Sequence, residues 1–143
     1  MLSTISKMTL KKEIAFLSDQ LKSVKSKKIV YLVAEDKKKG LIVGTASVRL
    51  QSGAQDHVGN LGITIRKEYR RLGLGKFLMK EIINLAKKEL KPRPKIIRLS
   101  VFHANKAAIN LYKKIGFKKA ARIPRQFRHG GELLDEVVMV KEV

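Results

Sequence analysis

The chain has 143 residues, a length typical of one domain with a full hydrophobic core, and we expect a single domain over residues 1–143. It has no cysteine, which excludes disulfides, thiolate metal sites and a cysteine acyl-enzyme. Its 32 lysines and arginines against 12 acidic residues give a formal net charge of +20, which favours polyanionic partners such as phosphorylated cofactors, nucleic acid or acidic proteins.

The sequence predicts neither a membrane span nor a signal peptide, and its first segment predicts a helix. No apolar run reaches the ~20 residues of a membrane span, and the opening MLSTISKMTLKK lacks the apolar segment of a signal peptide. We therefore expect a soluble, cytoplasmic protein. Apolar residues follow Thr9, a frequent N-cap residue type, at helical spacing: Leu10, Ile14, Leu17, Leu21 and Val24.

Three strands are predicted next. Residues 29–34 and 41–50 are apolar and flank the turn-like EDKKKG, a pattern typical of a β-hairpin. After the polar loop QSGAQD, residues 57–65 form a third predicted strand. The glycines within that strand indicate either a bulge or a close approach by a ligand.

The second half of the chain predicts alternating helices and strands. A helix over 76–90 ends before Pro92, a strand covers 95–102, and a second helix runs from Asn105 as N-cap to Gly116 as stop. FKKAARIP and ELLDEVVMV then flank RQFRHGG as a closing hairpin. This order of elements indicates an α/β fold with helices packed on a mixed sheet.

A glycine-rich turn precedes the first of these helices. Gly73 and Gly75 lie where the chain passes from strand into helix, beside Arg70, Arg71 and Lys76. Glycines let backbone N–H groups point outward, and a helix N-terminus carries about half a positive charge. The stretch therefore predicts a cradle for a pyrophosphate group. The alternative interpretation is a tight strand-to-helix turn with solvated arginines.

Two other phosphate-binding motifs do not fit this turn. A P-loop needs glycine where Arg70 stands and serine or threonine where Phe77 stands. The dinucleotide fingerprint needs a third glycine where Leu78 lies and an acidic residue about 20 positions later, and neither is present.

Two motifs occur here in a fixed order and spacing. The pattern Q/R-x-x-G-x-G/A reads Arg70, Arg71, Leu72, Gly73, Leu74, Gly75, and N-x-x-A-x-x-x-Y-x-x-x-G-F reads Asn105, Ala108, Tyr112, Gly116, Phe117. Together they resemble the signature of the GNAT superfamily of acetyl-CoA-dependent N-acetyltransferases. The resemblance runs from about His57 to the last residue and includes DEVVM in the final strand. It implies a GNAT-like mixed, largely antiparallel sheet, splayed at a cofactor cleft and flanked by helices.

The resemblance also implies where acetyl-CoA binds. The backbone of the glycine turn would hold the pyrophosphate, with these residues as the cofactor site: Arg70, Arg71, Leu72, Gly73, Leu74, Gly75 and Lys76. The backbone of Ile63, Thr64 and Ile65 would pair with the pantetheine arm like an added strand. Asn105 would hold the arm or cap its helix, and the two roles are compatible. No metal is implied.

Tyr112 is the predicted general acid and a further cofactor contact. It lies two helical turns after Asn105 on the same face. Attack of an amine on the thioester expels a thiolate, and a thiol of pKa about 8.5 can take its proton from a well-placed phenol of pKa about 10. The alternative interpretation is a core tyrosine on the face of Ala108, Leu111 and Ile115.

The general base stays open at this point. Some members of the superfamily resembled carry a glutamate where Ser100 aligns, and this chain lacks that carboxylate. Four nearby residues are alternatives, each also explained as an ordinary surface residue: His57, Glu68, His103 and Asp135. A water-relayed base, or an acceptor amine that is already partly neutral, would serve as well.

The identity of the acceptor stays open. Members of the superfamily begin with a strand and two helices that shape the acceptor site, and only about one helix is predicted before Ile29 here. The closing hairpin is basic, which favours an acidic acceptor or an RNA-rich setting, with a solvated hairpin as the default interpretation: Lys118, Lys119, Arg122, Arg125, Arg128 and His129. We predict acetyl transfer from acetyl-CoA to a primary amine, of a protein or a small molecule, directly in a ternary complex. The alternative is a noncatalytic CoA-binding or nucleic-acid-associated module. Any nucleic-acid contact is expected to be nonspecific, and the protein to be a monomer or homodimer.

Overall fold

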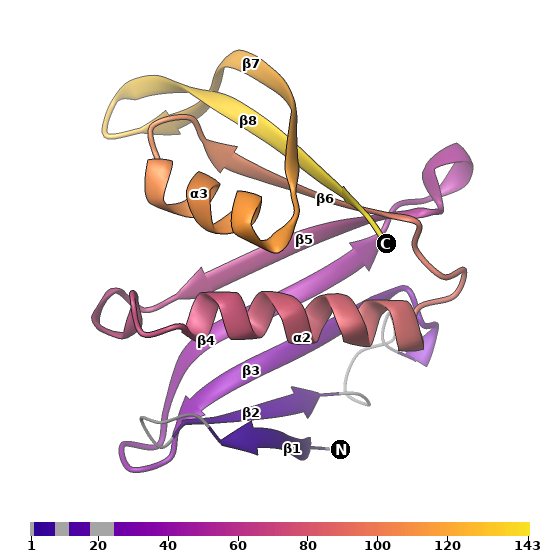
Figure 1. Cartoon of the computed structure of the whole chain (residues 1–143), viewed down its shortest axis with the longest axis vertical. Coiled ribbons are helices and arrows are strands. Elements are labelled where there is room, and N and C mark those ends of the chain that lie inside the picture. Colours follow the sequence, from indigo (N-terminus) through magenta and orange to yellow (C-terminus); the bar gives the residue numbers. More distant parts are fainter. Residues whose placement is uncertain (1, 8–11, 18–24) are drawn as a thin grey trace.

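The structure is a computed structural model that describes residues 2–7, 12–17 and 25–143 (Figure 1). One eight-stranded sheet has the order β1-β2-β3-β4-β5-β6-β8-β7. Its strands are β1 (Leu2–Lys7), β2 (Lys12–Leu17), β3 (Ile29–Asp36), β4 (Leu41–Leu50), β5 (Val58–Ile65), β6 (Ile96–Phe102), β7 (Lys118–His129) and β8 (Glu132–Glu142). Two helices lie wholly within the described residues, α2 (Leu74–Glu89) and α3 (Lys106–Ile115), with short 3-10 turns at η1 (Gly53–Gln55) and η2 (Lys67–Tyr69).

The sheet is mixed and largely antiparallel, as predicted. β5 and β6 run parallel, while the other neighbouring strands pair antiparallel. The parallel pair follows from the chain connection, because α2 carries the chain back from the end of β5 to the start of β6. The predicted hairpin of β3 and β4, the third strand and both later helices are confirmed.

The predicted N-terminal helix is wrong where the structure describes it. Lys12–Leu17 is strand β2, whose residue Ile14 lies opposite Ala34 of β3. The other positions of the predicted helix, Thr9, Leu10, Leu21 and Val24, lie outside the described residues. A short apolar pattern does not distinguish a helix from a strand, and the open edge of β3 offers backbone hydrogen bonds that only another strand can use.

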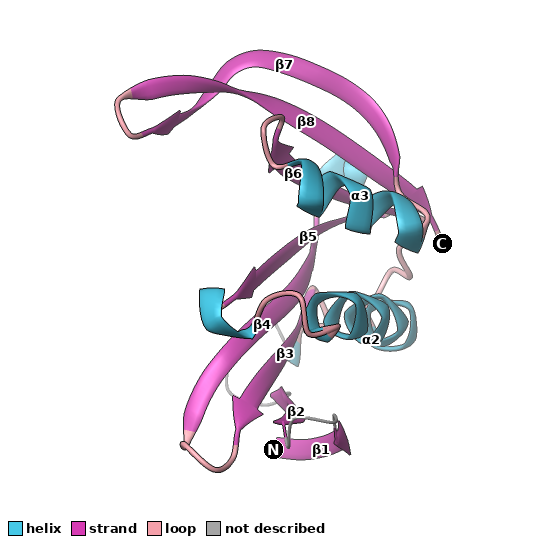
Figure 2. Cartoon of the chain, turned by 60° about the vertical axis from the view of Figure 1, so that its left-hand side comes forward, coloured by secondary structure: helices cyan, strands magenta, loops and turns pink. Residues whose placement is uncertain are grey.

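Both helices lie on the same side of the sheet, and the opposite face carries neither of them (Figure 2). α2 covers β3, β4 and β5, and it buries Leu78, Met79 and Ile82 completely. The core continues beneath α3 through Ile97, Leu99 and Val101 of β6. Because side chains alternate along a strand, the even-numbered residues of β6 lie on the face opposite the helices.

The predicted bulge in β5 is absent, and Gly59, one of the two glycines of that strand before Ile63, has a packing role instead. The pairing of β4 with β5 continues without a register shift. A Cβ on Gly59 would lie 2.6 Å from Val48 Cγ1 and 3.1 Å from Ile97 Cδ1. Gly59 therefore allows core side chains of neighbouring strands to approach closely, and it makes no room for a ligand.

The closing hairpin is longer than predicted. RQFRH, expected in the connection, belongs to β7, and the turn is confined to Gly130 and Gly131, which have φ values of 56° and 81°. The register of β7 and β8 shifts between Ile123 and Phe127. This irregularity bends β7 at Arg125 (φ 59°), whose backbone N–H donates to Asp135 Oδ1 at 3.0 Å.

Candidate functional site

The candidate site begins where β5 and β6 part. The two strands pair only from Val58 opposite Ile96 to Asn60 opposite Arg98. Beyond these residues they diverge, and Figure 1 shows the resulting opening between the ends of β5 and β6. α2 and α3 flank the opening, and their N-terminal ends point to the same side of the molecule.

The β5 edge of this opening offers backbone hydrogen-bonding groups. The carbonyl of Val58 accepts from Gln51 N at 2.8 Å, on the β4 side, whereas that of His57 accepts from Lys95 N at 2.9 Å, on the β6 side. Because backbone groups alternate in direction along a strand, Ile63 and Ile65 face the opening and Thr64 faces β4. The structure therefore brings two of the three predicted pantetheine-binding residues to the opening with their backbone groups, and turns Thr64 away.

The N-terminus of α2 lies beside this edge. Gly73 is its N-cap residue, in the left-handed conformation with φ 78°, and no side chain caps the helix. In the described part of the chain, nothing accepts a hydrogen bond from the N–H groups of Leu74, Gly75 and Lys76. Unpaired N–H groups and the positive end of the helix dipole together favour an anion here.

The two glycines of the turn serve different purposes. A Cβ on Gly73 would have nothing within 4 Å, so this glycine supplies the left-handed backbone and open space. A Cβ on Gly75 would lie 3.2 Å from Ile65 Cδ1 and 3.3 Å from Leu111 Cδ2. Gly75 thus brings α2, β5 and α3 together at the mouth of the opening.

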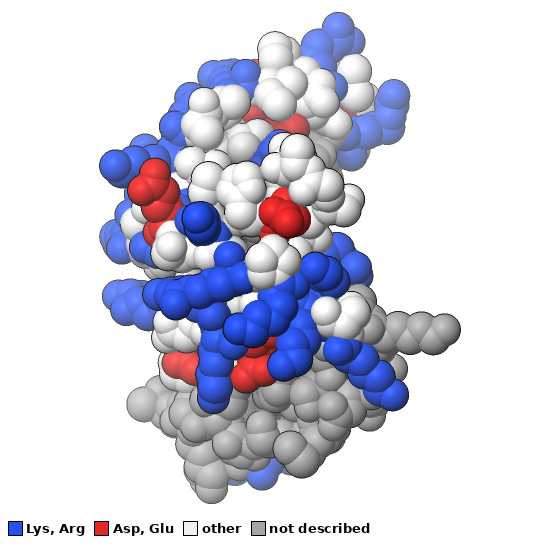
Figure 3. Space-filling view, turned by 90° about the vertical axis from the view of Figure 1, so that its right-hand side faces the viewer, with Lys and Arg blue, Asp and Glu red and all other residues white. Residues whose placement is uncertain are grey.

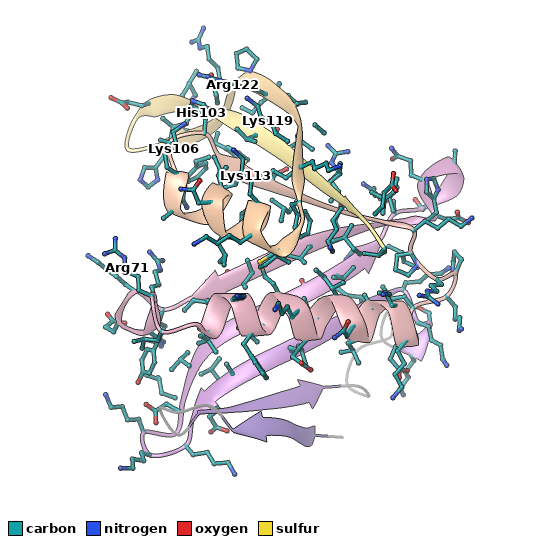
Figure 4. All side chains as sticks on the ribbon, in the orientation of Figure 1. Arg71, His103, Lys106, Lys113, Lys119 and Arg122 are labelled. Carbon is teal, nitrogen blue, oxygen red and sulfur yellow. The ribbon has the colours of Figure 1, made fainter. Side chains whose placement is uncertain are left out.

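The other residues of the turn divide into structural and exposed positions. Arg70 Nε donates to the Ile65 carbonyl at 3.1 Å and ties the turn to β5. Leu74 is 1% exposed and belongs to the core. Arg71, Leu72 and Lys76 are exposed. Figure 4 shows Arg71 at the turn before α2, on the same end of the molecule as Lys106 at the start of α3.

Tyr112 lies on α3 and is half-buried. It packs against the core with Ala108, Leu111 and Ile115, and its ring meets Phe117 at a centroid distance of 6.3 Å. Its hydroxyl has no hydrogen-bond partner among residues 25–143, whose side chains the structure describes. Burial raises the pKa of the phenol above its ordinary value, so Tyr112 stays protonated throughout the neutral range.

Asn105 caps α3. Its Oδ1 accepts from Ala108 N at 3.1 Å, the hydrogen bond expected of an N-cap residue. The side-chain oxygen is therefore occupied, and a contact with the pantetheine arm would come from the amide nitrogen.

Two of the alternative bases are tied to neighbouring cations. Asp135 accepts from Arg122 at 2.7 Å, and the backbone N–H of Arg125 and the Arg122 side chain lower the pKa of this carboxyl group. His103 Nε2 accepts from Lys106 Nζ at 3.2 Å, and burial together with Arg122 and Lys106 lowers the pKa of this imidazole. Figure 4 shows His103, Lys106 and Arg122 together near the start of α3. A lowered pKa makes each group a weaker proton acceptor.

The other two alternatives lie beyond opposite ends of β5. His57 precedes β5, at the end where β5 and β6 are still paired, and it lines a cavity of about 570 Å³ with Arg93 and Lys95. Glu68 lies in η2, an exposed 3-10 turn. His57 therefore lies at the paired end of the strands, whereas Glu68 lies in the connection from β5 to α2.

A different carboxylate lies beside Ser100. Ser100 Oγ donates a short hydrogen bond to Oε1 of Glu136, a half-buried residue of β8. In the register of β6 and β8, Glu136 lies opposite Phe102 and Ser100 lies opposite Val138, so both point to the face opposite the helices. Sequence reasoning missed Glu136. The DEVVM motif contains it, but only the strand register shows that it reaches Ser100.

A small cavity lies at the fork, near this pair. It has a volume of about 340 Å³ and is lined by Gln51, Asn60, Leu61, Arg98, Leu99 and Ser100. Asn60 and Arg98 form the last pair before the strands part. The cavity therefore lies where β5 and β6 part. A cofactor arm that passed between the two strands from the side of the helices would meet an acceptor bound on the opposite face of the sheet at this point.

A cluster of lysines and arginines lies at the start of β3 and in the segment after α2. Lys28 Nζ donates to the Lys91 carbonyl at 2.8 Å, and the Lys91 N–H donates to the Lys27 carbonyl at 3.0 Å, so the start of β3 and the segment after α2 lie together. With Arg93 and Lys95 they form a basic end at the C-terminal end of α2, and lysines and arginines gather across that face in Figure 3. This basic end is distinct from the fork.

The described part of the chain contains neither a membrane-spanning helix nor a candidate metal site. No helix there combines the length and the apolar character needed to cross a bilayer. No group of three histidine, aspartate or glutamate residues there is arranged to hold a metal ion.

Known proteins resemble this chain in sequence and in fold. A model of the acetyltransferase (GNAT) family matches residues 7–117. The L-amino acid N-acetyltransferase AaaT of Escherichia coli is 30% identical over 103 residues, which are 71% of this chain and 62% of AaaT. The chain thus spans about three fifths of that relative's length.

Solved structures share the fold. An acetyltransferase of the GNAT family from Streptococcus pneumoniae superposes with a TM-score of 0.75 and 29% identity, over 85% of this chain and 71% of that one. A putative acetyltransferase from Salmonella typhimurium, determined with its cofactor acetyl-CoA, has a TM-score of 0.70 and 22% identity over 80% of this chain and 64% of its own. The forked strands, the glycine turn at α2 and the match over most of the sequence place this chain in the acetyltransferase (GNAT) family.

Proposed function

We propose that the protein transfers an acetyl group from acetyl-CoA directly to an amine in a ternary complex. The observation that carries the proposal is the fork, where the strand edge at Ile63 lies beside an uncapped helix N-terminus. A phosphorylated cofactor with a peptide-like arm matches both parts, because the arm pairs with Ile63 and Ile65 while the pyrophosphate meets the N–H groups of α2. The family's use of acetyl-CoA supports this assignment.

The reaction can be written with Tyr112 as the proton donor. The amine nitrogen attacks the thioester carbonyl carbon, a C–N bond forms, and the C–S bond breaks with its electron pair on sulfur. The Tyr112 phenol gives its proton to that sulfur, and the proton released as the amide forms returns to the phenolate. A protonated amine must lose one more proton before it attacks, and that step needs a second group.

The acceptor is proposed to be a primary amine, of a small molecule or a protein. AaaT is named as an amino acid acetyltransferase, and a ribosomal-protein-alanine acetyltransferase from Brucella melitensis shares 25% identity with this chain and a TM-score of 0.71. These names supply the first compounds to assay. We expect thiol release from acetyl-CoA to accelerate in the presence of at least one amine from a panel of amino acids, peptides and polyamines.

The turnover assay also separates the proposal from its alternative. The noncatalytic alternative keeps the fold and the cofactor site but lacks an acceptor. It would bind CoA in a calorimetric titration yet release no thiol with any amine of the panel, and that result would overturn the proposal. The basic end favours a secondary, nonspecific contact with nucleic acid, which would weaken steeply with added salt.

Arg71 provides a test of the pyrophosphate position. It has a φ of 61°, a conformation that glycine adopts without strain, so Arg71→Gly removes the guanidinium while keeping the turn. We expect the Kd for CoA to rise about tenfold, because a charge-assisted phosphate contact is lost. Isothermal calorimetry measures the Kd, and the melting temperature should not fall.

Lys27 is the matched control for this variant. It also has a left-handed backbone, with φ 60°, but it lies at the basic end rather than at the turn. Lys27→Gly therefore removes one positive charge and the same kind of strain, and CoA affinity should stay within twofold of the parent. Equal losses of affinity in the two variants would show that net charge, rather than a contact at Arg71, attracts CoA.

A further inference from the structure

We propose that the cavity at the fork binds an amine acceptor that also carries a carboxylate, with Arg98 holding the carboxylate and Glu136 receiving the ammonium group. The proposal rests on the acetyl transfer proposed above and names the class of acceptor, of which free α-amino acids are the simplest members. Its basis is one small polar cavity with Arg98 in its wall and Glu136 beside it, hydrogen-bonded to the lining residue Ser100.

Arg98 supplies an unused cation. It is half-buried and lines the cavity, yet in the range 25–143, where side chains are described, no carboxylate lies within ion-pair distance of its guanidinium. The planar fork of donors of a guanidinium group matches a carboxylate. Gln51 and Asn60 add amide groups to the same walls. The cavity is therefore suited to an anion of carboxylate size.

Glu136 supplies the opposite charge on the same face, level with Phe102 and therefore four strand positions from Arg98. Ser100 lines the cavity and donates to Glu136 Oε1, and Oε2 has no hydrogen-bond partner among the side chains that the structure describes. Ser100 and Arg98 are separated by about 6.6 Å along β6, since each strand residue advances about 3.3 Å. Because Ser100 Oγ holds the Glu136 carboxylate, this spacing of Ser100 and Arg98 allows one small molecule to meet both charges.

The size and surroundings of the cavity agree with a small acceptor. A volume of about 340 Å³ lies at the lower end of the range for small-molecule sites. Phe102 and Phe127, whose ring centroids are 4.8 Å apart, continue the same face beyond Glu136. These rings offer an apolar surface for the remainder of the acceptor, so we choose leucine and its derivatives as probes.

Glu136 also completes the proton balance of the transfer. The ammonium group of the acceptor gives its first proton to the Glu136 carboxylate, which passes it to solvent after the reaction. The neutral amine then attacks, and its second proton reaches the departing sulfur by way of Tyr112. One proton is therefore released for each acetyl group transferred, and no other reactant is needed. Ser100 positions this carboxylate through its hydrogen bond. Ser100 itself stands where some members of the superfamily carry a glutamate, so Glu136 supplies a carboxylate at that point of the sheet from a different strand.

The experiment compares three amines of matched shape: leucine, leucinamide and 3-methylbutylamine. With the parent protein, kcat/KM should be highest for leucine, since only leucine carries a carboxylate. Arg98→Gln should lower kcat/KM for leucine about 10- to 100-fold, mainly through KM, while changing the value for leucinamide less than twofold. Glu136→Gln should instead lower kcat for all three amines about 100-fold and leave the CoA affinity unchanged.

Arg49→Gln is the matched control. Arg49 lies opposite Asn60 on β4 and is exposed, but it does not line the cavity. Its replacement removes the same charge from the same face and should leave the preference for leucine intact. The proposal is overturned if the parent accepts leucinamide as well as leucine, if Arg98→Gln affects both amines equally, or if Arg49→Gln reproduces the loss.

Direct binding separates this proposal from the proposed function. Leucine titrated into the protein with CoA present should bind to the parent and to Arg49→Gln, and at least tenfold more weakly to Arg98→Gln. If leucine binds in this pattern but no acetyl transfer occurs, the acceptor site stands and the enzymatic function fails. If other amines are acetylated while leucine does not bind, the function stands and the carboxylate site fails.

Discussion

Tyr112→Phe is expected to lower kcat by about 10² to 10⁴-fold, because it removes the proton donor for the departing thiolate. The ring remains, so the packing with Leu111, Ile115 and Phe117 is retained. The affinity for CoA should change little, since the hydroxyl matters chiefly as charge develops on sulfur. The measurements are kcat with an identified amine, a CoA titration and a thermal melt of both proteins.

The pH dependence gives a second test of Tyr112. Burial raises the pKa of its phenol above 10.0, so the protonated form persists below that pH and is lost only as the pH rises through the raised pKa. We expect the parent to lose kcat at the alkaline end of its profile and Tyr112→Phe to lack that limb. A kcat within twofold of the parent, when chemistry limits the rate, would show that Tyr112 is a packing residue only.

Leu78→Ala is expected to lower the free energy of unfolding by about 2 to 5 kcal/mol. Leu78 is completely buried, and its Cδ1 lies 3.0 Å from the position of a Cβ on Gly44, at the contact between α2 and β4. Alanine leaves a cavity that the neighbouring core cannot fill without moving the helix. Urea denaturation of both proteins measures the loss, and a change of less than 1 kcal/mol would contradict this role of Leu78.

Leu72→Ala is the matched control for that stability measurement. Leu72 lies in the turn before α2 and is 42% exposed, so its truncation removes little buried surface. We expect a change of about 0.5 kcal/mol or less. Because α2 carries the N–H groups of the proposed pyrophosphate site, Leu78→Ala should also weaken CoA binding, whereas Leu72→Ala leaves the helix in place.

Local patterns in the sequence determined most of the fold. Alternating apolar residues, turn residues and caps act over a few positions, and they predicted β3 to β6, α2 and α3. Asn105 as the N-cap of α3 and Gly116 as its left-handed C-cap are examples, because each cap depends on one residue and the adjacent backbone. The prediction of an N-terminal helix failed because β2 is not specified by local residues. It depends on pairing with β3, a separate segment of the chain.

The site divides in the same way. The sequence by itself located the glycine turn and the start of α2, because local spacing along the chain defines both. The catalytic role of Tyr112 rests on the family motif and stays a prediction. Only the tertiary structure decided that Thr64 faces β4 and that Glu136 reaches Ser100. Those relations follow from strand register, and register is set by pairing between segments that lie far apart in the sequence, as β6 and β8 do.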